Sequence, residues 1–241
     1  MRRRSILAAA ATAAVLAGGL RPARAEDSVD VLLVLAVDVS RSVDEEQARL
    51  QREGYYEAMT DPEVIEAIRG GMLGALGVTY MEWSGADWQR VIAPWTRIAS
   101  LPEAQAWVET LQRSPPRAIG WTSVSGAIDV SRRLLAEAPW YGMRRVVDIS
   151  GDGVNNSGRP SHEARDDAVA EGIIINGLPI LEERPFHGGI PLDEYYRRNV
   201  VGGPGSFVVP ADDFRSFAKA VRRKLVLEIA GIPVPGGVAR A

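Results

Sequence analysis

The feature that most constrains the fold is a continuous apolar stretch, VLLVLAV, which runs from Val31 to Val37. A strand with one face in water alternates apolar and polar residues, whereas a strand covered on both faces is apolar throughout. Comparable stretches recur at Arg145–Ser150 and Ile173–Leu181, and segments with the apolar spacing of amphipathic helices lie between them. Strands that alternate with such helices predict an α/β fold with a doubly wound, mostly parallel sheet and helices on both faces.

The remaining elements follow from the same spacing and from turn residues. Ser84–Asp87 joins two strand-like segments and predicts a hairpin, so we expect one antiparallel edge strand. We predict six strands, over Val31–Val37, Leu73–Trp83, Trp88–Trp95, Arg145–Ser150, Ile173–Leu181 and Phe207–Val209. We predict helices over Asp44–Met59, Pro62–Ile68, Leu101–Arg113, Ser123–Ala138 and Ser161–Glu171, and a last helix that Asp212 caps and that carries Phe214 to Ile229. The segment 182–206 predicts irregular structure with one helical turn at Leu192–Arg198.

The first 25 residues have the pattern of a secretory signal peptide. Three arginines, Arg2–Arg4, precede an alanine-rich apolar stretch from Ile6 to Leu20, and Ala23–Ala25 gives a small-x-small cleavage pattern. The stretch is too short for a good membrane span. We therefore expect an exported, periplasmic protein with one domain over 26–231 and a flexible tail over 232–241. The arginines leave both the general and the twin-arginine export routes open.

Charge and cysteine content exclude several classes of function. The predicted signal peptide holds five of the 28 basic residues and none of the 31 acidic ones, so the mature chain has a net charge of about −8. Binding to nucleic acid needs a basic surface, and we therefore expect no nucleic-acid partner. The chain has no cysteine, which excludes disulfides, a thiol nucleophile and a thiolate metal site.

Polar residues gather where three predicted elements meet one edge of the sheet. Asp38, Ser40 and Ser42 follow the first strand, Thr122 precedes a helix, and Asp152 lies in a Gly-Asp-Gly turn after another strand. Each alone has an ordinary explanation, because these residue types also cap helices and form turns. In α/β sheets, however, ligands bind at the carboxyl ends of the strands, where we expect all three segments to converge.

These residues resemble the metal-ion-dependent adhesion site of the von Willebrand factor type A domain family. The family pattern is Asp-x-Ser-x-Ser, a threonine and an aspartate in an Asp-Gly turn, and its five positions correspond to Asp38, Ser40, Ser42, Thr122 and Asp152. The resemblance covers Val29 to Ile229 and is greatest to an uncharacterised exported bacterial group of unknown function. Two features depart from the pattern, namely Asp148 within a strand and the long insert 182–206.

The resemblance implies a function in binding. A hard divalent cation such as Mg²⁺, or Mn²⁺ or Ca²⁺, prefers about six oxygen ligands, and the five side chains would leave one position to water. In the family, an Asp or Glu of a protein or peptide partner completes that shell. Two alternatives stay open: a metal-assisted phosphohydrolase, and a structural domain without metal. A haloacid-dehalogenase-type site would need a second aspartate two residues after the first, where this chain has Ser40.

Other residues near this edge have both functional and structural explanations. Asp148 shares strand parity with Asp152, and we expect it in a buried ion pair with Arg144 or another arginine. Asn155 and Asn156 fit a turn or a ligand contact. Trp83 and Trp121 fit the core or an interface. The insert carries a group that fits a partner-binding rim or a solvated turn, namely Tyr195, Tyr196, Arg197 and Arg198. We expect His162 and His187 to be surface residues.

Overall fold

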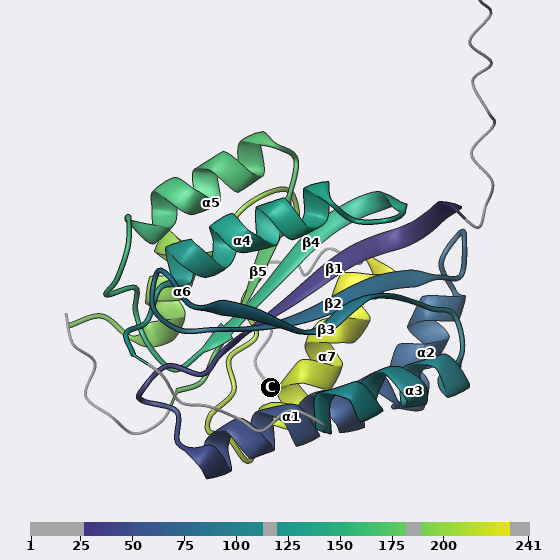
Figure 1. Cartoon of the computed structure of the whole chain (residues 1–241), viewed down its shortest axis with the longest axis horizontal. Coiled ribbons are helices and arrows are strands. Elements are labelled where there is room, and N and C mark those ends of the chain that lie inside the picture. Colours follow the sequence, from purple (N-terminus) through teal and green to yellow (C-terminus); the bar gives the residue numbers. More distant parts are fainter. Residues whose placement is uncertain (1–26, 113–119, 182–188, 232–241) are drawn as a thin grey trace, which may run out of the picture.

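Strand β1 (Ser28–Asp38) lies at the centre of the sheet. The computed structural model describes residues 27–112, 120–181 and 189–231. β1 pairs in parallel with β2 (Leu76–Trp83) on one side and β4 (Tyr141–Gly151) on the other. β5 (Ile174–Pro179) extends the sheet in parallel beyond β4, and β3 (Gln89–Ile98) is the antiparallel edge strand (Figure 1). The predicted parallel sheet with one antiparallel hairpin strand is therefore confirmed.

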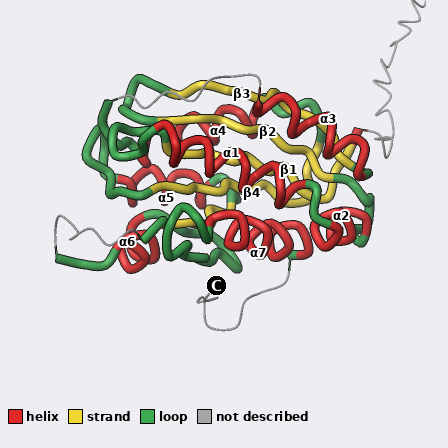
Figure 2. The backbone as a smooth tube through the Cα atoms, turned by 90° about the horizontal axis from the view of Figure 1, so that it is seen from below, coloured by secondary structure: helices red, strands yellow, loops and turns green. Residues whose placement is uncertain are grey.

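Helices cover both faces of this sheet (Figures 1 and 2). One face carries α1 (Glu45–Met59), α2 (Pro62–Arg69), α3 (Leu101–Gln112) and α7 (Phe217–Ala230). The other face carries α4 (Val124–Ala136) and α5 (Ser161–Ala170), while α6 (Leu192–Asn199) packs beside β5.

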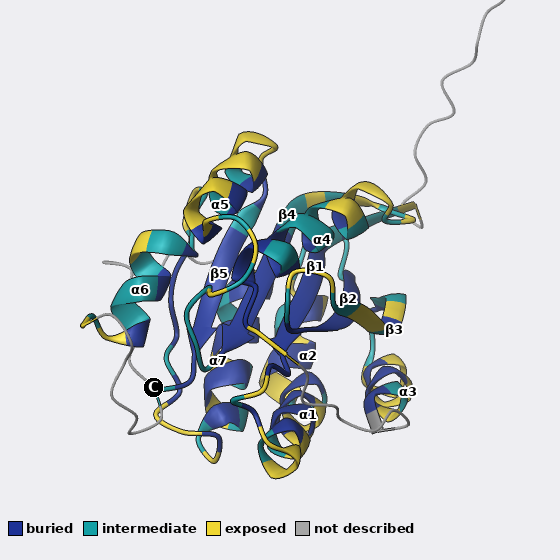
Figure 3. Cartoon of the chain, turned by 60° about the vertical axis from the view of Figure 1, so that its left-hand side comes forward, coloured by how far each residue is buried: buried dark blue, intermediate teal, exposed yellow. Residues whose placement is uncertain are grey.

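The apolar stretch of β1 is buried because it serves two cores. Val31, Leu33, Leu35 and Val37 point into the cluster under α1 and α7, and the residues between them point into the cluster under α4 and α5. Figure 3 shows the central strands buried, the edge strand β3 partly exposed, and the outer sides of the helices exposed. Successive side chains of a strand point to opposite faces of the sheet. Because both faces are buried here, all of these side chains are apolar.

The sheet has five strands within the described residues, and the prediction of a sixth at Phe207–Val209 is wrong. Val208 forms a parallel bridge with Gly177, and Ala211 forms one with Ile180, so this segment runs in register beside β5. In that register, the amide of residue 179 would donate to the carbonyl of Val209. Residue 179 is proline, which has no N–H, and the ladder is interrupted there.

A buried charge cluster fastens α7 to the sheet. Lys224 Nζ lies 2.7 Å from Asp148 Oδ1 and also pairs with Glu228, and all three side chains are buried. The predicted buried ion pair of Asp148 is therefore confirmed, but its partner is a lysine and not an arginine. Arg144 lies four residues earlier on β4, about 13 Å along an extended strand, and donates instead to the carbonyls of Glu228 and Ile229 at 2.7 and 2.6 Å.

The last helix begins later than predicted. α7 begins at Phe217, because Asp213 and Ser216 bond to each other in a turn: Ser216 N donates to Asp213 Oδ1 at 2.7 Å. None of the described helices is long and apolar enough to cross a membrane. The predicted signal peptide, the tail beyond residue 231 and His187 lie outside the described residues.

Candidate metal centre

Asp38 is the most constrained residue of the candidate site. It ends β1, is fully buried, and its Oδ1 accepts a hydrogen bond from Ser40 N at 2.7 Å. The Asp38 carbonyl accepts from Gln51 Nε2 of α1 at 3.0 Å. α1 itself begins directly after the loop, with Asp44 and Gln47 forming a capping box. A buried strand and a capped helix therefore fix the loop from both sides.

The structure brings all five predicted residues together. Ser42 Oγ donates to Asp152 Oδ1 at 2.6 Å, across 110 positions of sequence. Thr122 Oγ1 donates to Ser40 Oγ at 3.2 Å, across 82 positions, and the Ser40 and Ser42 hydroxyls lie 3.2 Å apart. The result is a continuous cluster of three hydroxyls and two carboxylates at the carboxyl ends of β1 and β4. Their role as metal ligands remains a prediction.

The electrostatics of this cluster favour a cation. Asp38 Oδ2 is buried and has no hydrogen-bond partner among the described residues. Burial raises the pKa of Asp38 well above its ordinary value, and the nearby Asp152 carboxylate raises it further. A buried anion beside a second carboxylate is unfavourable unless a positive charge compensates it. The cluster therefore fits a hard divalent ion, which would supply that charge and accept the unpartnered oxygen as a ligand.

Asparagine side chains hold the Thr122 loop in place. Asn156 Oδ1 accepts from Thr122 N at 2.8 Å, and Asn156 N donates to the Thr122 carbonyl at 2.8 Å. Asn155 Oδ1 accepts from Ser125 N at 3.0 Å, in the first turn of α4. These asparagines thus join the Asp152 turn to the Thr122 loop, which is a role that sequence reasoning did not assign to them.

The two tryptophans near the site have opposite environments. Trp83 is fully buried in the core under α4, whereas the side chain of Trp121 is 69% exposed. Trp121 directly precedes Thr122, in a loop where Gly120 has a φ of 68° and accepts a hydrogen bond from Arg41 N at 3.1 Å. An exposed aromatic residue on a fixed backbone therefore stands beside the metal centre.

The predicted rim in the 182–206 insert is a helix, α6, and its residues differ in role. Arg197 and Arg198 pair with Asp193 and Glu194 on the helix itself. Tyr195 OH bonds to Ser161 Oγ at 2.8 Å. Tyr196 is fully buried, which neither expectation for this segment included. The spacing of Leu192 and Tyr196, one helical turn apart, was the available signal.

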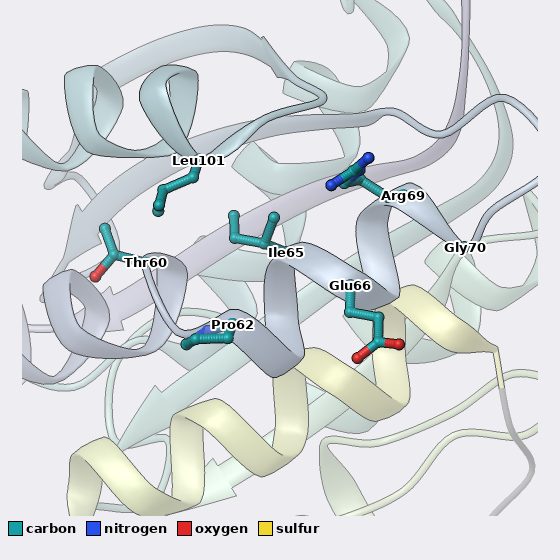
Figure 4. Close-up of a pocket in the computed structure, with 7 residues that line it drawn as sticks. All are labelled: Thr60, Pro62, Ile65, Glu66, Arg69, Gly70 and Leu101. Atoms are coloured by element: carbon teal, nitrogen blue, oxygen red, sulfur yellow. The ribbon is translucent and has the colours of Figure 1, made fainter.

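Two further features lie apart from the metal centre. His162 is exposed on α5, as predicted. A surface hollow lies at the far end of α1, which is about 22 Å long at 1.5 Å per residue. Its lining residues are Thr60, Pro62, Ile65, Glu66, Arg69, Gly70 and Leu101 (Figure 4).

A family model described as "Protein of unknown function (DUF1194)" matches residues 28–233. No curated protein matches the chain.

Solved structures of von Willebrand factor A proteins share the fold. One is a von Willebrand factor type A protein from Catenulispora acidiphila, with 15% identity and a TM-score of 0.60, covering 83% of this chain and 43% of that one. Another is proximal thread matrix protein 1 from the mussel byssus with a zinc-occupied MIDAS motif, with 18% identity and a TM-score of 0.60, covering 84% and 48%. This chain thus spans less than half the length of either protein.

A third structure matches over nearly its whole length. It is an aerotolerance-related membrane protein from Bacteroides fragilis, with 20% identity and a TM-score of 0.53, covering 81% of this chain and 98% of that one. At these identities the likeness shows the fold, which is that of the von Willebrand factor A domain.

Proposed function

We propose that this chain, which belongs to the DUF1194 family of proteins of unknown function, is an exported binding module that captures an acidic group of a protein or peptide partner through a divalent cation. The ligands would be the five oxygen-bearing side chains of the metal centre: Asp38, Ser40, Ser42, Thr122 and Asp152. The observation that carries the proposal is their convergence from three distant segments, together with a buried oxygen of Asp38 that has no hydrogen-bond partner in the described part of the chain.

The ligand chemistry favours Mg²⁺ or a similar hard ion. Hydroxyl and carboxylate oxygens suit Mg²⁺, Mn²⁺ and Ca²⁺. Among the described residues, no three of the His, Cys, Asp and Glu side chains gather into a group that fits a metal, so the neutral hydroxyls are essential to the set. The similar mussel protein carries zinc in its MIDAS motif, which agrees with a divalent ion of some kind at this position.

The same set of ligands explains why a partner would bind. If each of the five side chains supplies one oxygen, one of the six positions that Mg²⁺ prefers is left for water or for an external oxygen. The carboxylate of a partner's Asp or Glu offers a charged oxygen for that position. Exposed Trp121, next to Thr122, would contact the partner around it.

We propose binding rather than catalysis. Ser40 occupies the position at which a haloacid-dehalogenase-type phosphohydrolase would have its second aspartate. The hydroxyls of Ser40, Ser42 and Thr122 bond to one another and to Asp152, and within the described residues none of them forms a hydrogen bond with a histidine that could act as a base.

Titration calorimetry with Mg²⁺, Mn²⁺ and Ca²⁺ tests the metal centre. Asp38→Asn and Thr122→Ala should each weaken binding by about 100-fold or more, since losing a direct ligand should exceed the 10- to 100-fold effect typical of outer-shell groups. Asp61→Asn is the matched control, because Asp61 caps α2 at the far end of α1. Equal affinities in Asp38→Asn and wild type would overturn the proposal.

The partner requires a second experiment. A pull-down from periplasmic extract, with and without chelator, should recover a protein only when metal is present. The same protein should be lost with Asp38→Asn and retained with Asp61→Asn. Recovery that does not depend on the metal would count against capture through the ion.

A further inference from the structure

The insert after β5 places an unexplained hydroxyl beside the metal centre. Tyr196 of α6 is fully buried, and its hydroxyl has no hydrogen-bond partner among the described residues. Asp38 Oδ2 is in the same condition. Buried polar atoms are almost always hydrogen-bonded in native proteins, so two such atoms at one site need an explanation.

Gly151 shows how close these two oxygens lie to a common point. A Cβ atom built on Gly151 would lie 2.8 Å from Asp38 Oδ2 and 3.0 Å from Tyr196 OH. Both oxygens therefore lie about 3 Å from one point beside Gly151, at the end of β4. A hydroxyl can donate and a carboxylate oxygen can only accept, so a single water between them would satisfy both groups.

The packing of Tyr196 indicates a built position rather than an accidental one. A Cβ on Gly177 of β5 would lie only 2.7 Å from Tyr196 Cδ1, so the absence of a side chain there makes room for the ring. The neighbouring Tyr195 OH bonds to Ser161 Oγ and accepts from Asn155 N at 3.2 Å, which ties α6 to α5 and to the turn after Asp152. Glycines on two strands thus accommodate a ring whose hydroxyl lies on the same side of Gly151 as Asp38 Oδ2.

We propose that Tyr196 is a positioning residue of the metal centre, whose hydroxyl donates through one intervening water toward Asp38 Oδ2 and holds that carboxylate in the orientation the cation requires. The inference rests on the proposed function for the presence of the ion. It adds a residue outside the five ligands, from a segment in which this chain departs from the family pattern. Groups that orient metal ligands in this way typically change metal affinity by about 10- to 100-fold.

Tyr196→Phe tests the proposal, because it removes the hydroxyl and keeps the ring. Calorimetry should show Mg²⁺ affinity weakened by about 10- to 100-fold, with the melting temperature of the metal-free protein unchanged or higher. Tyr80→Phe is the matched control. Tyr80 is also fully buried, and its hydroxyl too has no hydrogen-bond partner within the described residues, but it lies on β2 against α1. Removal of the Tyr80 hydroxyl should therefore leave Mg²⁺ affinity unchanged.

A spectroscopic signature separates positioning from plain packing. Adding Mg²⁺ to the wild type should shift the tyrosine absorbance band as the Tyr196 hydrogen bond changes, and Tyr196→Phe should lose that shift while Tyr80→Phe keeps it. Tyr196→Met, which retains apolar volume without a hydroxyl, is measured in parallel so that the comparison does not depend on one variant folding.

The outcomes distinguish this inference from the proposed function. Wild-type protein that binds none of the three cations would overturn both. Wild-type binding that both Tyr196 variants retain in full would overturn the role of Tyr196 and leave the proposed function standing. Loss of stability in both Tyr196 variants with unchanged Mg²⁺ affinity would show that Tyr196 serves packing alone.

Discussion

Gly151 is the tightest point of the metal centre at the scale of single residues. Its missing Cβ would lie 2.8 Å from Asp38 Oδ2 and 3.1 Å from Asp38 Cβ, closer than side chains normally approach. We expect Gly151→Ala to displace the Asp38 carboxylate. Mg²⁺ affinity should fall at least ~10-fold, as for loss of an orienting group, and the free energy of unfolding should fall by about 1–3 kcal/mol, as for overpacking elsewhere.

Calorimetry and urea unfolding measure these two effects, and Gly85→Ala is the control. Gly85 also lies beside the loop that carries Thr122, but a Cβ on Gly85 would contact only Trp121 N, at an ordinary 3.8 Å. Equal Mg²⁺ affinities in the two variants would show that the space over Gly151 is not part of the site.

The five candidate ligands could be predicted from sequence because short-range chemistry marks each of them. Asp38, Ser40 and Ser42 follow a strand whose continuous apolar sequence marks it as buried. The carboxyl ends of parallel strands meet at one edge of the sheet, which predicts that Thr122 and Asp152 lie near them. Tyr196 could not be assigned, because its burial depends on how α6 packs over Gly177 and Gly151. The partner of Asp148 was missed for a similar reason, since Lys224 reaches it from a helix 76 positions later.

At the scale of elements, the attachment of α7 to the sheet depends on a buried cluster with two carboxylates and one amine. Lys224 of α7 pairs with Asp148 of β4 and with Glu228, while Asn176 Nδ2 of β5 donates to Glu228 Oε1 at 2.9 Å. Burial raises the pKa of Glu228 to about 7, against the opposing effect of Lys224. Burial also raises the pKa of Asp148. The cluster thus holds more negative charge than Lys224 alone can balance.

The sign of the resulting pH dependence follows from proton binding. The ordinary pKa of Glu228 is 4.5, so between about pH 4.5 and 7 the folded protein keeps a proton that the unfolded chain has released. The contribution of Glu228 to stability is therefore full below pH 4.5 and is lost as the pH rises through 7.

Glu228→Gln should remove this pH dependence, because the amide stays neutral and retains an acceptor for Asn176. Between pH 5 and pH 8, the free energy of unfolding of the variant should rise relative to that of the wild type by about 1–3 kcal/mol. Urea unfolding at each pH measures the difference. Glu57→Gln, on the exposed side of α1, should follow the wild type, and a Glu228→Gln curve parallel to the wild type would contradict the assignment.

The order and type of the elements were predictable because apolar spacing and turn residues specify them locally. The sixth strand failed for a reason that is visible in the sequence only once its neighbour is known. Pro179 does not disturb the pairing of β5 with β4. It interrupts the ladder only with the segment around Val208, where a backbone N–H at position 179 would have to donate. Which strands pair depends on the arrangement of the whole sheet, so it cannot be predicted from the sequence of one segment alone.

At the scale of the whole molecule, the metal centre joins parts of the chain that are otherwise held apart by the sheet. The ligands come from the end of β1 and the loop that leads to α1, from the loop before α4, and from the turn after β4. A cation that binds all three would bind the folded chain only. Binding should therefore stabilise the entire domain, by about 2.7 kcal/mol when the free ion is at 100 times its dissociation constant.

For a domain of this size, 1 kcal/mol shifts the melting temperature by about 2–4 °C, so saturating Mg²⁺ should raise it by roughly 5–11 °C. A chelator should reverse the shift. The chain has a formal net charge of −3, and about −8 without the predicted signal peptide, so any salt would reduce its self-repulsion. NaCl at equal ionic strength isolates that general effect, and Asp38→Asn isolates the site. A Mg²⁺ shift that NaCl reproduces, or that survives in Asp38→Asn, would mean that the ion screens the surface and does not bind between the three segments.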